Sequence, residues 1–382
     1  MKKLTIRRLN WFLARQKNET RRSRSRRRKL LRVSEDLFAN SAIQQQSIIQ
    51  RVSSPEQKAA PPQFVYVRQN RTFRRELIIP PETFSLRGDY DNVVSFFQHL
   101  RDRAYNIPPT SASALGVDFR SIKKITPGAA LVLAAELYRW QIFTQRKLVP
   151  VMQDDWDPLI SRMLRDFGLF EFLETPDQRP EPSPSEPPFF KFIKYRSGVG
   201  VTPTACSDLL DHLSAIVGSI EAEKFIFDGL VEALNNVKHH AYPDNSGWHG
   251  VSSGTWLMCG AYSERAKVLT AAVYDMGVGI PATLPRSGLW EQIKGILAAF
   301  GANDDSSMIA AAMQAGRTRT GQVERGKGLP IMMRLFDHVR GHLRILSGHG
   351  EVRYTSGASE IGRIGRPLSL GGTLIQWQIS KV

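Results

Sequence analysis

Cysteines and long apolar runs are both scarce in this chain of 382 residues. Its 2 cysteines, Cys206 and Cys259, are too few for a disulfide framework or a cysteine-based zinc site. We therefore expect a reducing, cytoplasmic setting. The longest apolar run, residues 128–140, is interrupted by Glu136, so we expect no membrane-spanning segment.

Acidic residues are also scarce in the first fifth of the chain. Residues 1–75 hold 20 of the 52 Lys and Arg residues but only 4 of the 36 Asp and Glu residues, so the net charge of +16 lies there. We expect the basic segment 1–32 to be disordered and the whole of residues 1–62 to act as tail and linker. The basic segment is either an arm that binds nucleic acid or a solubilising tail.

Predicted strands and helices alternate between residues 63 and 175, which indicates one α/β domain. The expected strands are 64–67, 76–79, 115–119 and 147–152, and the expected helices are 91–105, 129–141 and 157–173. Six prolines between residues 176 and 188 then predict an extended spacer and a domain boundary.

The order of these elements resembles a STAS domain, the fold of anti-sigma-factor antagonists. The resemblance is carried by Gly-Val-Asp-Phe at 116–119 and by Ile-Thr-Pro-Gly at 125–128, before a helix. In that family a phospho-acceptor lies at this turn, where this chain has Thr126. Because Ile125 replaces the family's Asp and Pro127 follows, Thr126 is either a phosphorylation site or only a helix N-cap.

A polar row marks the predicted helix 224–240. Glu232, Asn236 and His240 are four residues apart, so they are expected to lie on one helical face. An Asn side chain can supply a neutral oxygen to Mg²⁺, and a Glu can orient or deprotonate an attacking group. This pairing suits a metal–nucleotide site.

Glycine-containing segments follow the polar row. The predicted strand 268–274 is followed by Asp275, whose carboxylate can accept a hydrogen bond from an exocyclic amine, and by two glycines that permit close approach of a flat base. The sequence Arg-Gly-Lys-Gly-Leu at 325–329 opens a predicted helix, 330–338, whose N-terminus favours a phosphate. Finally, Gly-Gly-Thr at 371–373 precedes the last predicted strand.

In this order and spacing, the segments resemble the GHKL ATPases, which include DNA gyrase, histidine kinases and anti-sigma serine kinases. The resemblance covers residues 189–382 and implies a Bergerat-type, two-layer α/β sandwich that binds ATP and Mg²⁺. It implies that Asn236 is the Mg²⁺ ligand, Glu232 the catalytic general base, and Asp275 the acceptor for the adenine amine. The other implied nucleotide-binding residues are Gly277, Gly279, Gly326, Lys327, Gly328 and Thr373.

Two site assignments stay open. Asn235 is a second candidate for the Mg²⁺ ligand, but Glu232 fits only the register with Asn236, which we prefer. Residues 301–325 lie where the family carries its ATP lid, and Arg317 and Arg319 in this segment are either phosphate ligands or exposed arginines.

The two resemblances together suggest a regulatory protein that binds Mg-ATP and acts in phospho-signalling with a partner of the STAS or sigma-factor type. If it is an active enzyme, it is a serine/threonine protein kinase or an ATPase. The alternative is an ATP-dependent clamp, with a homodimer closing on nucleic acid held by residues 1–32.

Overall fold

The computed structural model describes residues 66–69, 73–106, 115–173, 189–243, 253–315 and 328–380. All of them belong to one compact unit, Ala59–Val382. The basic segment 1–32 and the proline-rich stretch 176–188 lie outside the described residues. Within the described ranges, no helix is both long enough and apolar enough to cross a membrane.

The N-terminal half, residues 66–173, is built around a four-stranded sheet in the order β1-β2-β4-β6. Strand β1 is antiparallel to β2, whereas β2, β4 and β6 are parallel, so each parallel pair is joined through a helix. Strands β3 and β5 form a separate parallel pair. The bounds are β1 Tyr66–Gln69, β2 Phe73–Ile78, β3 Thr83–Phe84, α2 Tyr90–Asn106, β4 Leu115–Val117, η1 Phe119–Ser121, β5 Lys124–Ile125, α3 Pro127–Thr144, β6 Val149–Pro150, η2 Gln153–Asp155, α4 Pro158–Phe167 and η3 Leu169–Phe172.

The C-terminal half, residues 189–380, contains an antiparallel sheet in the order β12-β11-β10-β13-β9-β8-β7. The chain is therefore a mixed α/β protein with parallel and antiparallel sheets, as expected. The strands are β7 Lys191–Val199, β8 Thr255–Ser263, β9 Val268–Asp275, β10 Gly341–Ser347, β11 Gly350–Thr355, β12 Gly362–Gly365 and β13 Thr373–Ser380. The helices are α5 Pro203–Val217, α6 Glu223–Asn236, η4 Val237–Ala241, α7 Ile280–Thr283, η5 Leu284–Arg286, α8 Trp290–Phe300, α9 Asp305–Ala315, α10 Gly328–Met333 and η6 Arg334–Asp337.

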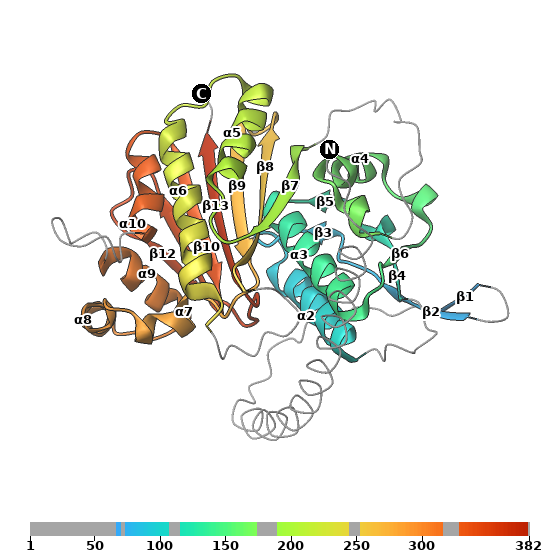
Figure 1. Cartoon of the computed structure of the whole chain (residues 1–382), viewed down its shortest axis with the longest axis horizontal. Coiled ribbons are helices and arrows are strands. Elements are labelled where there is room, and N and C mark those ends of the chain that lie inside the picture. The colour runs from blue at the N-terminus through green and yellow to red at the C-terminus, as the bar shows by residue number, and fades with distance from the viewer. Residues whose placement is uncertain are drawn as a thin grey trace, which may run out of the picture. The chain divides into compact units, whose positions relative to one another are not determined.

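Both faces of this antiparallel sheet are covered. Helices α5, α6, α9 and α10 pack on one face, where Trp256 and Met258 of β8 belong to their core (Figure 1). The intervening residues Leu257, Cys259 and Ala261 point to the opposite face and join the core of the N-terminal half. Because side chains of a strand alternate between faces, β8 is buried along its whole length.

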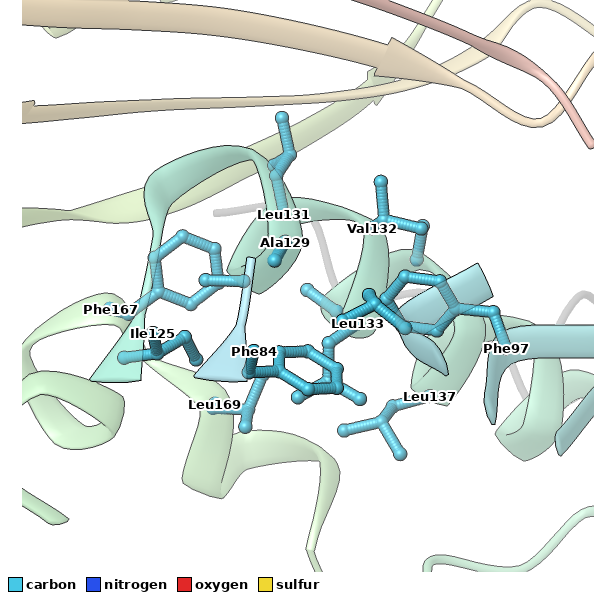
Figure 2. Packing of buried hydrophobic residues seen from close by; sticks show 14 of the residues in the cluster. Phe84, Phe97, Ile125, Ala129, Leu131, Val132, Leu133, Leu137, Phe167 and Leu169 are labelled. Carbon is cyan, nitrogen blue, oxygen red and sulfur yellow. The ribbon is translucent and has the colours of Figure 1, made fainter. Parts of the chain in front are cut away.

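Helix α3 covers that second face. Leu131 and Val132 point toward the strands of the antiparallel sheet, whereas Leu133 and Leu137 lie on the other side of the helix, among residues of the N-terminal half (Figure 2). Gly128 lets the helix approach β13, since an added Cβ would lie 2.6 Å from the amide nitrogen of Gln376. One helix thus belongs to the cores of both halves.

Buried ion pairs accompany this packing. Arg101 of α2 and Glu136 of α3 are paired, with 8% and 2% of their surfaces exposed. In the C-terminal half, Glu351 accepts hydrogen bonds from Arg344 and Arg366. Arg344 also donates to the carbonyl oxygen of Leu86 at 2.8 Å, which links the antiparallel sheet to the N-terminal half.

Replacing Leu131 by Ala should destabilise the whole described unit. The side chain is fully buried, and such truncations cost about 2–5 kcal/mol of unfolding free energy. Urea unfolding should show one transition at a lower midpoint, while Lys124→Ala, at an exposed position, should leave the midpoint nearly unchanged. Separate transitions for the two halves in the wild type would contradict the shared core.

Candidate functional site

Helix α6 carries Glu232 and Asn236 in its last two turns. Its apolar stripe, which includes Leu230 and Leu234, is buried against the antiparallel sheet and fixes the helix. After Asn236 the helix widens into the π-helical turn η4, a feature that often occurs at functional sites. The turn changes the helical spacing, and His240 is exposed beyond the partly buried Glu232 and Asn236.

The start of α10 lies against this polar row. An added Cβ on Gly328 would lie 2.5 Å from Glu232 Oε1 and 3.2 Å from Asn236 Nδ2, so glycine permits the close approach. The structure therefore brings Glu232, Asn236 and Gly328 together. The neighbouring Asn235 donates from Nδ2 to Glu232 Oε2 at 3.3 Å.

Asp275 ends strand β9 and faces Thr373, its register partner on β13. Its Oδ1 accepts a hydrogen bond from the Gly277 N–H at 2.8 Å. Burial raises the pKa of the carboxyl group to about 7, although backbone hydrogen bonds from Gly277 and Thr373 oppose the shift. A buried carboxyl group with a raised pKa is typical of a binding or catalytic site.

The turn after Asp275 is joined to the end of the α6 region. An added Cβ on Gly277 would clash with the carbonyl oxygen of Ala241, and the Val278 N–H donates to that oxygen at 2.9 Å. The hydroxyl of Tyr242 accepts from the Met276 N–H at 2.9 Å and donates to the Thr255 carbonyl oxygen at 2.6 Å. These contacts hold the Asn236 helix and the Asp275 turn in one fixed arrangement.

Ser347 connects Thr373 to the turn that contains Gly279. The sequence did not predict a role for this residue. Ser347 is fully buried, and its hydroxyl lies 2.9 Å from the Thr373 hydroxyl and accepts from the Ile280 N–H at 2.8 Å. Gly279 has φ +89°, and an added Cβ would come within 3.0 Å of the Ser347 oxygen. A lone Ser at the end of a strand gave no sequence signal for this role.

Some expected site residues lie outside the described residues: Gly326, Lys327, Arg317 and Arg319. Within the expected lid, residues 305–315 instead form helix α9, which is packed in the core. Asp304 precedes this helix. Burial alone would raise its pKa, but hydrogen bonds from Ser306 and Ser307 together lower the pKa to about 2.

Thr126 is the backbone N-cap of α3, followed by Pro127 at the first helical position. Its side chain makes no capping hydrogen bond, and the hydroxyl donates instead to the Phe84 carbonyl oxygen at 3.5 Å. Thr126 therefore occupies the N-cap position through its backbone, but its hydroxyl does not cap the helix.

The described residues contain no group of three or more His, Cys, Asp or Glu side chains that could hold a metal ion alone. A metal ion bound to Asn236 would therefore need further oxygen ligands from a molecule bound at the site. Comparison of the chain with protein-family models and with curated proteins finds no match to either.

The raised pKa of Asp275 makes stability depend on pH. Between about pH 4 and pH 7 the folded protein holds a proton that the unfolded chain has lost, so the free energy of unfolding falls as the pH rises. Asp275→Asn removes this contribution. Relative to the wild type, the variant should gain about 4 kcal/mol of stability between pH 4 and pH 8, as measured by urea unfolding. Identical pH profiles for both proteins would contradict a raised pKa of the buried Asp275 carboxyl group.

Proposed function

We propose that the C-terminal half binds Mg-ATP and belongs to the GHKL type, closest to the anti-sigma serine kinases. The observation that carries the proposal is the gathering of segments far apart in the sequence. Gly328 lies against Glu232 and Asn236, Gly277 lies against Ala241, and Thr373 faces Asp275. These are the segments that the resemblance assigns to one nucleotide site.

The chemistry of the residues supports the same roles. Among the described residues, backbone N–H groups of Gly277 and Thr373 donate hydrogen bonds to the buried Asp275 carboxyl group, so its ionised form suits a further N–H donor, such as the exocyclic amine of adenine. Asn236 can offer an amide oxygen to Mg²⁺, which binds oxygen ligands and usually retains water or phosphate oxygens. Backbone N–H groups at the start of α10, beside Gly328, suit phosphate oxygens.

Turnover would depend on Glu232. It lies beside Asn236 and has one carboxylate oxygen facing Gly328. A carboxylate in this position can accept a proton from an attacking hydroxyl or water while Asn236 holds the metal. With an alcohol as acceptor the activity is that of a serine/threonine kinase, and with water it is that of an ATPase.

The N-terminal half supports a signalling role for this site. Its strand and helix order follows the order that suggested a STAS domain, and it is packed on the antiparallel sheet through α3. We therefore propose a phospho-signalling protein in which a STAS-like domain and its ATP-binding domain form one unit, and whose external partner is of the STAS or sigma-factor type.

Asn236→Ala and Glu232→Gln should separate binding from catalysis. In calorimetric titrations of the full chain, Asn236→Ala should lose the Mg²⁺-dependent part of the ATP affinity, because a metal ligand is missing. Glu232→Gln keeps the shape beside Gly328 and should bind Mg-ATP normally, while any phosphate release or transfer falls by about 10²–10⁴.

The matched control is Asn235→Ala, which alters the adjacent amide and should retain Mg²⁺-dependent binding. If Asn235→Ala abolished the metal effect and Asn236→Ala did not, the ligand would be Asn235. Turnover at the wild-type rate in Glu232→Gln would refute the general-base role.

A further inference from the structure

We propose that helix α2 of the N-terminal half positions the base-recognising end of the nucleotide site, with Arg101 as the principal positioning residue. The inference rests on the proposed function. It adds that a partner bound to the N-terminal half can change the nucleotide affinity. The evidence for the inference is the set of contacts made by the loop that precedes strand β13.

Four consecutive backbone carbonyl groups of this loop each accept a hydrogen bond from a side chain. From α2, Tyr90 Oη donates to Leu368, Gln98 Nε2 to Ser369 and Arg101 Nη2 to Leu370, at 2.9, 3.3 and 2.6 Å. From β9, Tyr274 Oη donates to Gly371 at 3.3 Å. Surface loops usually leave such carbonyl groups to water, so this row fixes the loop on α2 to an unusual degree.

Arg101 is itself held firmly from the opposite side. Its Nε and Nη2 atoms donate to Glu136 Oε1 on α3 at 2.8 and 2.6 Å, and the side chain is buried. On the loop side, Gly371 has φ +78°, and an added Cβ there would clash with Nη1 of Arg101. The guanidinium group therefore spans the space between α3 and the loop with no room for adjustment.

The same loop sets the surroundings of Asp275. Gly372 lies so close that an added Cβ would clash with the Asp275 carbonyl oxygen. The next residue, Thr373, hydrogen-bonds the Asp275 carboxylate through its backbone and contacts Ser347 through its hydroxyl. A shift of residues 368–371 must therefore move the groups that orient the carboxylate.

This connection makes nucleotide binding and the state of the N-terminal half interdependent. A partner that displaces α2 would loosen the loop and weaken recognition of the base. By thermodynamic linkage, bound nucleotide would resist that displacement by the same free energy. Phosphate and metal contacts at Asn236 and Gly328 lie on other elements and should respond less.

The test uses the full chain with Tyr90→Phe, Gln98→Ala, their double variant and Arg101→Lys. Tyr90→Phe removes only the hydroxyl, and Arg101→Lys keeps the charge beside Glu136 but loses the forked contact. Asp102→Ala, at an exposed position of the same helix, is the matched control. Calorimetry measures the dissociation constants of Mg-ATP and Mg-GTP, and urea unfolding confirms that each variant is folded.

We expect each lost hydrogen bond to weaken Mg-ATP binding by about two- to tenfold, with a larger loss in the double variant. Mg-GTP should lose less, so the ratio of the two affinities should shrink, while Asp102→Ala leaves it unchanged. The inference would be overturned if folded variants kept the wild-type ratio of Mg-ATP to Mg-GTP affinity, even if their urea midpoints fell. A wild-type protein that binds no ATP would instead refute the proposed function.

Discussion

Helix α3 is buried on every side along most of its length, and both halves of the described unit pack around it. Its residues fill the space between the antiparallel sheet and the N-terminal half, and strands β8 and β9 present an apolar surface to it. Because α3 also carries Glu136, its position fixes Arg101 and with it the side of α2 that holds the loop before β13. The packing that joins the two halves therefore also determines the geometry next to Asp275.

The candidate site lies at the ends of β9, β13 and α6, where two glycines lie closer to neighbouring atoms than a residue with a side chain could. Gly277 lies against Ala241, and Gly328 lies against Glu232. Each contact brings together two segments that are assigned different roles in the proposed site. Burial of Asp275 is unfavourable for the isolated protein, since it raises the pKa of the carboxyl group. A ligand that donates a hydrogen bond to the ionised carboxylate would offset this cost of burial. The buried carboxylate is therefore suited to the proposed ligand.

Much of this arrangement could be predicted from local patterns. The alternation of strands and helices and the segments around Glu232, Asp275 and Gly328 were visible in the sequence, because periodicity and glycine placement are local signals. The shared core was not predicted, although apolar residues occupy every face of α3 and β8 lacks polar alternation, both of which indicate burial on every side. Ser347 and the carbonyl row at residues 368–371 could not have been predicted, since they depend on contacts between distant segments.

Hydrogen–deuterium exchange of the full chain, with and without Mg-ATP, tests directly whether these segments form one nucleotide site. We expect slower exchange with Mg-ATP in three separate segments at once: 232–242, 275–281 and 368–374. The last of these should respond although α2 holds three of its carbonyl groups, because the loop borders Asp275. Unchanged exchange in these segments at saturating Mg-ATP, or protection confined to other parts of the chain, would contradict a nucleotide site at this place.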